Sequence, residues 1–394
     1  MADEKFQTPF WLEGLRKEFP VTEKWAYFDS AYETGGARFL EKASKQYFAD
    51  KSDFYPGISQ MGGSGKGAAI DLIEETRTLL AEFLNARDGH SIAFTANTCQ
   101  AVALALQSYP FEPGDNVVVG DIEHVCVLYP AISLKQRGVE VRLVHPENEW
   151  SLTAEKLLEQ VDDHTKFVVV SYVQSASGYR IDLEKLVKEC HKKNCYVVTD
   201  AIQLLGFQKM DVREIGVDAV AASGYKGLLS IEGGGFLYVA DALLEKLRPW
   251  SAGPNPALVI DRETGTWSCK DELDARKLEA GTLPFHTIYC LHESLLQLKK
   301  IGMDEIAKHV EQCYQYISSG MKALGYEIDT PEENHCHSML VVTKKKEEMA
   351  DYFQQHGVFF TAGHGDHVRL AAAPFTSEED IRKLLKVAKM WKKF

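Results

Sequence analysis

The sequence predicts an α/β protein with two domains, and two observations carry this prediction. First, between about residues 70 and 240, short β-branched apolar runs alternate with amphipathic stretches, which is typical of a mostly parallel sheet flanked by helices. Second, the alternation weakens after about Pro254, and 394 residues exceed one ordinary globular core. We expect a large domain with a seven-stranded sheet and a smaller α+β C-terminal domain.

Each element of the large domain is predicted by its own pattern. The strand candidates are the apolar runs at 91–95, 116–121, 139–145, 166–173, 195–201, 218–223 and 234–240. The helix candidates, with apolar residues three and four apart, are 70–85, 99–108, 153–161 and 183–193. This spacing places the apolar residues on one face of each helix, where the sheet can cover them.

The C-terminal part has its own elements. A helix is expected over about 285–300, strands near Met339 and Val368, and a last helix starting at Thr376 or Ser377, where a hydroxyl cap precedes three acidic residues. We expect residues 1–25 to form an arm that joins the small domain, residues 26–284 to form the large domain, and residues 285–394 to form the small one.

Composition narrows the range of partners. The net charge of −13 argues against nucleic-acid binding, which needs a basic face. No stretch approaches the roughly 20 apolar residues of a membrane span. The first residues, MADEKFQTPFW, lack the basic leader and apolar core of a secretory signal. We expect a cytoplasmic protein that contacts neither membrane nor nucleic acid.

The cysteines and histidines do not predict a metal site. Eight cysteines are spread along the chain without a CxxC pair, so we expect reduced thiols rather than a disulfide framework. His335, Cys336 and His337 lie close together, but alternation along a strand would put only the two histidines on one face. We therefore predict no metal.

The central chemical feature is SGYKG at 223–227, directly after a buried strand and shortly before EGGG. Ligands of open α/β sheets collect beyond the carboxyl ends of the strands, which places Lys226 at a cleft. Asp200 follows the preceding strand in TDAIQ. A buried carboxylate keeps the ring nitrogen of pyridoxal phosphate protonated, as an electron sink requires. The alternatives are an exposed loop lysine and an aspartate that only caps a helix.

Two further segments fit a phosphorylated ring. FTANTCQAV at 94–102 opens a helix whose amides can cradle a phosphate, to which the Thr98 and Ser223 hydroxyls would add donors. His124 follows VVVGDIE and could lie flat over a pyridine ring. An ordinary polar residue at a strand end is the alternative for this histidine.

Together these residues resemble the class V aminotransferase and cysteine desulfurase-like superfamily of pyridoxal-phosphate enzymes, which have fold type I. The resemblance covers nearly the whole chain and rests on the order of its segments. They are FTANT, EH at Glu123, SYVQSASGYRIDL, DAIQ, SGYKG, EAGT at 279–282 and VRLAAAPF followed by EEDI.

The resemblance implies a role for each matching residue. Lys226 would form the Schiff base, Asp200 would pair with the ring nitrogen, and His124 would stack on the ring. The remaining cofactor positions would be Thr98, the amide of Cys99 and Ser223 at the phosphate, Gln203 at the phenolic oxygen, Ser175 over the cofactor, Tyr225 before the lysine, and Thr282 at the neighbouring subunit's phosphate. Arg369 would bind the substrate carboxylate through its guanidinium fork.

Departures from the family pattern bear on the reaction. Cysteine desulfurases carry a nucleophilic cysteine on the loop before the carboxylate-binding arginine, whereas this chain reads FFTAGHGDHVRL there. We therefore expect that it is not a persulfide-forming desulfurase. Ser175 stands where desulfurases often have asparagine, and Tyr225 stands where they often have histidine, so the substrate stays open.

A competing motif, GGSGKG at 62–67, resembles a nucleotide-binding P-loop. No buried strand precedes it, and Gly67 stands where a hydroxyl should follow the lysine. We interpret it as a loop near the mouth of the active site.

The expected activity is that of an enzyme acting on an amino acid. The substrate amine would displace Lys226 to give an external aldimine, and the freed lysine would remove the Cα proton. We expect lyase-type β-elimination of a C–S or similar bond. Transamination, epimerisation or racemisation, and β- or γ-replacement stay open, as does an idle cofactor-binding scaffold. We also expect a homodimer with shared sites, although Thr282 could instead cap the following helix.

Overall fold

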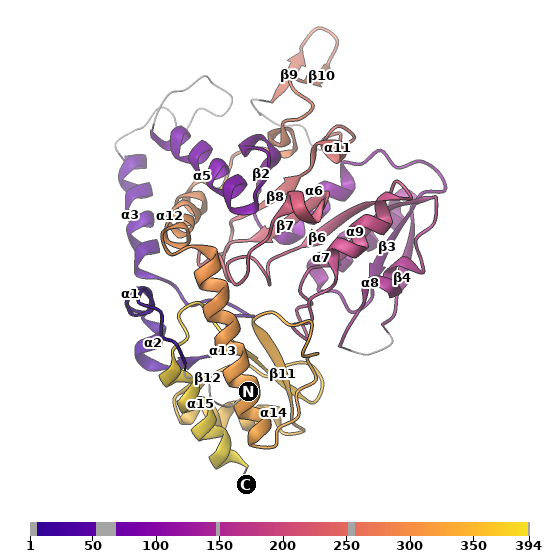
Figure 1. Ribbon diagram of the computed structural model, residues 1–394. Helices are drawn as coiled ribbons and strands as arrows, with labels where there is room; N and C mark the ends of the chain where they lie inside the picture. The colour runs from indigo at the N-terminus through magenta and orange to yellow at the C-terminus, as the bar shows by residue number, and fades with distance from the viewer. Residues whose placement is uncertain (1–5, 53–67, 147–149, 251–256, 393–394) are drawn as a thin grey trace.

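The structure is a computed structural model that describes residues 6–52, 68–146, 150–250 and 257–392. Its centre is a seven-stranded sheet with the strand order β2-β8-β7-β6-β5-β3-β4 (Figure 1). The strands are β2 (Ile92–Thr95), β3 (Asn116–Gly120), β4 (Glu140–Val144), β5 (Thr165–Ser171), β6 (Tyr196–Asp200), β7 (Ala219–Ser223) and β8 (Gly235–Val239). β8 runs antiparallel to both neighbours, and the other pairs are parallel. The predicted α/β fold and its seven strands are confirmed.

Both faces of this sheet are buried. Along β5, Phe167 and Val169 join one core cluster while Val168 and Val170 join another, because successive side chains point to opposite faces of a strand. Strands covered on both faces read as continuous apolar runs, which is why these runs stood out in the sequence. The associated helices are α5 (Ala68–Leu84), α6 (Thr98–Gln107), α7 (Val125–Ser133), α8 (Ala154–Leu158), α9 (Leu183–His191), α10 (Val212–Ile215) and α11 (Asp241–Leu244), with short 3₁₀ turns at Gly89–Ser91, Leu134–Arg137 and Ala275–Leu278.

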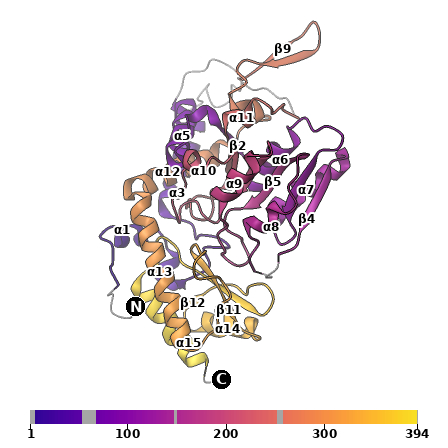
Figure 2. The same cartoon turned by 45° about the vertical axis from the view of Figure 1, so that its right-hand side comes forward.

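The C-terminal part forms a second unit below the sheet in Figures 1 and 2. It contains α13 (Met303–Ala323), β11 (Ser338–Val342), α14 (Lys346–Gln355), β12 (Val358–Phe359), β13 (His367–Ala371) and α15 (Glu378–Trp391), and α12 (Phe285–Ile301) leads into it. β11 and β13 pair antiparallel. α15 begins at Ser377 with a capping box to Asp380, which confirms the predicted start of this helix.

The N-terminal segment joins this second unit. It carries α1 (Leu12–Lys17), α2 (Val21–Lys24), β1 (Ala26–Tyr27) and α3 (Arg38–Ser52). β1 pairs in parallel with β12, and Arg16 donates to Asp380 at 2.5 Å. The long helix α12 packs on α3 and α5, so it also borders the sheet unit. The domain boundaries at residues 25 and 284 stay predictions.

Two elements differ from the sequence patterns. The helix expected over 153–161 ends early, as α8, because the chain turns after Leu158 towards the start of β5. β9 (Leu258–Asp261) and β10 (Thr266–Cys269) form a hairpin that projects from the top of the molecule in Figure 1. Its side chains are mostly exposed, so it lacks the apolar pattern that would predict it.

Three further predictions concern the GGSGKG loop, the cysteines and membrane-spanning helices. The GGSGKG segment lies outside the described residues. The eight cysteines are free thiols. Across the described ranges, no helix combines the length and the apolar character that crossing a bilayer requires.

Candidate active site

Several polar residues meet where neighbouring strands end. Ser171, Asp200 and Ser223 are the last residues of β5, β6 and β7, and Ser171 lies opposite Asp200 in the register. Because these strands are parallel, their carboxyl ends share one edge of the sheet. β2 also points towards this edge, since β2 and β7 both run antiparallel to β8. The expected convergence of these segments is therefore present.

A tight turn after β7 holds Lys226. Ser230 N donates to Gly224 O at 2.9 Å, and Leu229 N donates to Lys226 O at 2.9 Å. Gly227 is required for this packing, since a Cβ there would lie 2.2 Å from the carbonyl oxygen of Leu205. The close approach presses the turn against the chain that follows Asp200 and leaves Lys226 only 8% exposed.

Burial shifts the pKa values of Lys226 and Asp200 in opposite directions, and the charge of each group acts on the pKa of the other. Burial lowers the pKa of Lys226 to about 8, although the Asp200 carboxylate acts in the other direction. Burial raises the pKa of Asp200 to about 6, against the hydrogen bond from Ile202 N at 2.9 Å and the charge of Lys226. A buried amine that loses its proton near neutral pH can act as a nucleophile or as a base.

The N-terminus of α6 lies against the end of β7. Asn97 caps the helix by accepting from Gln100 N at 2.9 Å. Thr98 N donates to Ser223 Oγ at 2.8 Å, and the two hydroxyl oxygens are 3.0 Å apart. Cys99 follows in the same first turn. Two hydroxyls at a helix N-terminus are a suitable donor set for a phosphate group.

Gln203 supplies a direct test of fit for a ring cofactor. It is buried just after Asp200, and its Nε2 donates to Ala31 O at 2.8 Å. Its Oε1 has no partner among the residues that the structure describes, which is costly for a buried polar atom unless a ligand satisfies the amide. With the amine of Lys226 and the carboxylate of Asp200 nearby, these groups fit pyridoxal phosphate.

The segment after β3 forms another wall. His124 caps α7, and its Nδ1 accepts from Cys126 N at 3.2 Å. Burial, and then the charges of Lys226 and Arg369, lower the pKa of His124, so this imidazole is neutral at pH 7. Glu123 lies behind it, fully buried, and accepts from Ser171 N at 3.1 Å and Ser171 Oγ at 2.5 Å.

Arg369 approaches the site from the second unit. It lies on β13, and its Nη1 donates to the carbonyl oxygen of Ser175. Burial lowers the pKa of the Arg369 guanidinium, whereas the charge of Asp29 raises it. Asp29, held by Thr361 Oγ1 at 2.9 Å, also acts on Lys226. The arginine thus reaches the segment that follows β5 at this edge of the sheet.

Tyr225 and Thr282, two of the predicted site residues, lie in different parts of the structure. Tyr225 borders the site: its carbonyl accepts from Thr34 N at 3.2 Å, and burial raises the pKa of its phenol to about 12. Thr282 is exposed and lines a separate cavity with Tyr47 and Lys51. Among the described residues, the hydrogen bonds of Thr98 and Ser223, which include those to each other, do not involve Thr282.

Sequence reasoning missed two residues near the site. Asp29 follows a strand of only two residues, AY, which is too short to show alternation. Trp150 lines a cavity with His124 and Ser175. A strand-end acid in YFDS could have indicated Asp29, whereas the position of Trp150 depends on the tertiary fold alone.

His335 and His337 pack against aromatic rings of the protein. His337 stacks on Phe207, with ring centroids 3.6 Å apart, and His335 stacks on Tyr314 and contacts Glu311 at 3.0 Å. Among the described residues, no group of three or more His, Cys, Asp or Glu side chains is placed to hold a metal ion.

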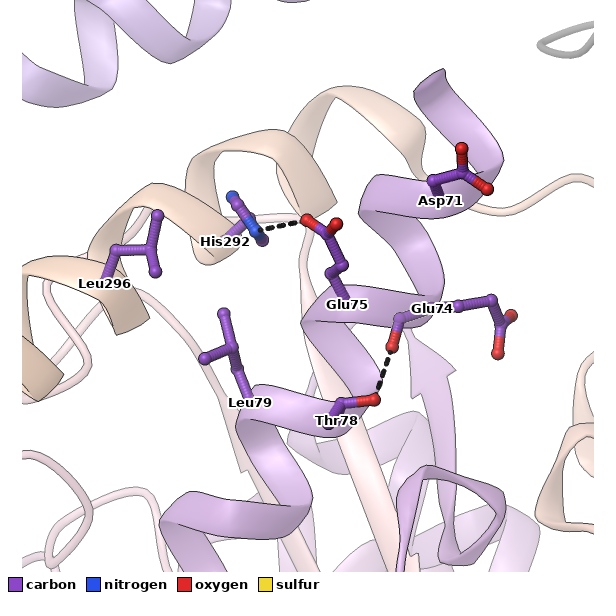
Figure 3. A pocket seen from close by; sticks show the side chains of 7 residues that line it. All are labelled: Asp71, Glu74, Glu75, Thr78, Leu79, His292 and Leu296. Carbon is purple, nitrogen blue, oxygen red and sulfur yellow. Dashed lines mark hydrogen bonds and ion pairs between the residues drawn. The ribbon is translucent and has the colours of Figure 1, made fainter. Parts of the chain in front are cut away.

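Another cavity, of about 630 Å³, lies between α5 and α12. Figure 3 shows its acidic lining and the contact between His292 and Glu75, 3.5 Å apart. None of the predicted site residues lines this cavity. Its size alone therefore does not make it the active site.

Known proteins match this chain over most of its length. A probable cysteine desulfurase of Methanothermobacter thermautotrophicus is 29% identical over 317 residues, covering 78% of this chain and 76% of that protein. An uncharacterized aminotransferase of Schizosaccharomyces pombe is 29% identical over 387 residues, covering 96% and 95%.

Solved structures share the fold. The apo cysteine desulfurase of Thermococcus onnurineus superposes with a TM-score of 0.86 at 21% identity, covering 99% of each chain. A Lys-to-Ala mutant of C-DES, with glycine covalently linked to the PLP cofactor, gives a TM-score of 0.84 at 19% identity, covering 97% of this chain and 99% of that one. These neighbours confirm fold type I.

One expectation needs correction. The exclusion of persulfide-forming cysteine desulfurase activity is contradicted, because relatives and structural neighbours named cysteine desulfurases match along the chain. The inference looked for a thiol on one loop only. The fold places two other thiols at the site: Cys99 and Cys126 lie in the first turns of α6 and α7, and Cys126 lies near Asp200 and Lys226.

The family model for class-V aminotransferases matches residues 27–387. That range includes the lysine turn, the α6 N-terminus and the arginine strand described above. This chain therefore belongs to the class-V aminotransferase family, and its cofactor is pyridoxal 5′-phosphate.

Proposed function

We propose that this protein cleaves the C–S bond of a sulfur-containing amino acid by β-elimination. The observation that carries the proposal is the convergence of Lys226, Asp200 and Arg369, contributed by the turn after β7, by β6 and by β13, on one site. Support for sulfur chemistry comes from the relatives named cysteine desulfurase and from the neighbour titled cystine C–S lyase.

Lys226 has two tasks in this proposal. Its amine holds the cofactor, and once substrate has displaced it, the same amine takes the proton from Cα. A pKa near 8 suits both tasks, because a sizeable fraction of the amine is neutral close to physiological pH. Pyridoxal 5′-phosphate supplies the electron sink that stabilises the negative charge left at Cα.

Asp200 and His124 would set the cofactor's electronic state and position. The Asp200 carboxylate would hold a proton on the ring nitrogen, and its burial strengthens that interaction. His124 would stack on the ring as a neutral imidazole, which adds no positive charge over it. Gln203 would bind the phenolic oxygen, and Tyr225 and Ser175 would border the ring.

The phosphate and the substrate carboxylate would occupy opposite ends of the site. Thr98, Ser223 and the amide of Cys99 would hold the phosphate at the start of α6. Arg369 would bind the substrate carboxylate in a bidentate pair, which fixes Cα beside Lys226. Thr282, which is exposed and lines a different cavity, would serve a second subunit in a homodimer.

A second candidate is desulfuration of cysteine, which leaves alanine and passes sulfur to a thiol. The names of the relatives favour it. The two reactions share substrate binding and removal of the Cα proton. Elimination would release sulfide or a thiol together with pyruvate and ammonium, whereas desulfuration would leave the sulfur on a thiol of the protein and release alanine with its amino group.

The experiment is a product assay. Purified enzyme loaded with pyridoxal phosphate is incubated with cysteine, cystine and a panel of other amino acids, with and without a keto-acid acceptor. β-Elimination predicts pyruvate, ammonium and a sulfur product in equal amounts without an acceptor. Alanine as the main product would establish desulfuration instead. No product from any sulfur amino acid, or turnover only with an acceptor, would contradict the proposal.

A further inference from the structure

A cavity of about 330 Å³ adjoins the proposed substrate site. Its walls come from the segments after β3, β4 and β5 and from the loop before β13. They comprise Ile122, Glu123, His124, Val125, Trp150, Gln174, Ser175, Ala176, Ser177, His364 and Gly365. The carbonyl of Ser175 accepts from Arg369, so the cavity begins where the substrate carboxylate would be bound.

The described lining of the cavity is largely aromatic. Trp150 and the imidazoles of His124 and His364 line it, and among the residues that the structure describes no Lys, Arg or Asp does so. Glu123, the acidic residue of this described lining, directs its carboxylate to Ser171. Such a lining favours an uncharged group that can pack against rings, because an unpaired charge would lose its hydration.

The walls are held in place by contacts outside the cavity. Gln174 joins Leu152 through two hydrogen bonds, of 3.1 and 2.9 Å. The indole of Trp150 meets His367 edge-on, with ring centroids 4.7 Å apart, and His367 Nε2 lies 2.6 Å from Asp329 Oδ2. The cavity is therefore built before substrate arrives, as in other small-molecule sites.

Size indicates what the cavity accepts. The cofactor ring would take the part of this cavity of about 330 Å³ that lies beside His124 and Ser175, and the part bordered by Trp150 and His364 would be left for the side chain of the substrate. The thiol of cysteine alone would cover little of these two rings. An aromatic substituent on sulfur would fill this space.

We propose that this cavity binds the leaving group of an S-substituted cysteine whose substituent is bulky and uncharged, with Trp150 as the main specificity-determining wall. The inference rests on the proposed β-elimination. The Cβ–S bond breaks, sulfur leaves with the electron pair and takes up one proton, and water converts the remainder to pyruvate and ammonium. The overall change is S-substituted cysteine plus water to thiol, pyruvate and ammonium, with no oxidant or reductant.

The test compares S-benzylcysteine with S-methylcysteine. Holoenzyme should show a kcat/KM for S-benzylcysteine at least about tenfold higher, as expected for filling an apolar pocket. Trp150→Ala should remove most of this preference, because it should lower kcat/KM for S-benzylcysteine far more than kcat/KM for S-methylcysteine. Trp267→Ala, an exposed tryptophan on the β9–β10 hairpin, is the matched control and should change neither value.

A binding measurement separates this inference from the proposed reaction. The binding of both compounds to Lys226→Ala loaded with pyridoxal phosphate is measured from the change in cofactor absorbance. S-benzylcysteine should bind about tenfold more tightly than S-methylcysteine, and the double variant that also carries Trp150→Ala should show no difference in affinity. Turnover of S-methylcysteine without any benzyl preference would overturn the cavity assignment alone. A retained binding preference without pyruvate release would overturn the elimination reaction alone. An equal loss of kcat/KM for both substrates in Trp150→Ala would show that Trp150 has only a structural role and would overturn its role in specificity.

Discussion

Lys226 and Asp200 show how the fold changes the chemistry of single residues. Both are buried at the sheet edge, and burial disfavours the charged form of each. The sequence could place them together because each directly follows an apolar strand. It could not give their pKa values, because these depend on burial in the folded chain and, for Lys226, also on the charges of residues far along the chain such as Arg369 and Asp29.

The lowered pKa of Lys226 leads to the first prediction. The rate at which apo-protein forms its covalent adduct with pyridoxal phosphate should rise about tenfold per pH unit up to about pH 8 and then level off, since only the neutral amine attacks. Stopped-flow absorbance between pH 6 and 10 measures this rate. An N-acetyl-lysine amide control corrects for ionisation of the cofactor. A rate that keeps rising to pH 10, like that of the control, would refute the lowered pKa.

Glu123 leads to the second prediction. Burial raises its pKa from 4.5 to about 7, so the folded state binds a proton that the unfolded state has released between these values. Its burial therefore costs stability as pH rises from about 4.5 to 7, and the cost is complete above 7.

Glu123→Gln removes that cost while keeping the shape and an acceptor for Ser171. Apo-protein carrying it should gain about 1–3 kcal/mol at pH 8 and almost nothing at pH 4.5. Urea denaturation at both pH values measures the difference. An equal effect at the two pH values would show that the carboxyl titrates normally.

At the scale of elements, the predictable part of the site is the part attached to strands. Ser171, Asp200 and Ser223 end parallel strands, so apolar periodicity and the rule about carboxyl ends place them together. Thr98 was predictable for the same reason, because α6 follows β2 directly. Trp150 and Asp29 lie on segments without strong periodicity, and their positions depend on packing between the two units.

A buried ion pair between Arg77 and Glu279 connects α5, β2 and the segment after the 3₁₀ turn Ala275–Leu278, and it is the basis of the third prediction. Arg77 on α5 lies 2.7 Å from Glu279 and donates to Ile92 O of β2 at 2.8 Å, and Glu279 accepts from Phe94 N at 2.7 Å. Arg77→Met would leave the Glu279 carboxylate buried without its cation. We expect a loss of about 3–5 kcal/mol in the free energy of unfolding.

Chemical denaturation measures this loss. Arg382→Met, which breaks an exposed pair with Glu378, is the matched control and should cost less than about 1 kcal/mol. The double variant Arg77→Met with Glu279→Gln should recover part of the loss. Equal effects of Arg77→Met and Arg382→Met would show that the buried pair contributes no more than a surface one.

At the scale of the molecule, the position of Thr282 leads to the fourth prediction, a homodimer with shared sites. Thr282 is exposed and lines a cavity whose described walls include neither Thr98 nor Ser223. In a two-fold dimer, each subunit would bring this hydroxyl to the other's phosphate, because such an interface is self-complementary. The sequence order predicted this arrangement only through the family resemblance.

Mixed dimers test the sharing. Lys226→Ala subunits are combined with Thr282→Ala subunits, and mixed dimers are isolated by two different tags. One site of each mixed dimer would then have both native residues, so activity should recover to about half that of wild type. Sedimentation first establishes the dimer. Full activity in a verified monomer, or no recovery in verified mixed dimers, would contradict shared sites.

The identity of the cofactor-bearing lysine is the claim on which the other proposals depend. Borohydride reduction of the holoenzyme, followed by peptide mass spectrometry, fixes the cofactor where it is bound. The account predicts a pyridoxyl group on the peptide that contains Lys226, and its loss in Lys226→Ala with the fold intact. A pyridoxyl group on another lysine, such as Lys66, or an undiminished adduct in Lys226→Ala, would contradict it.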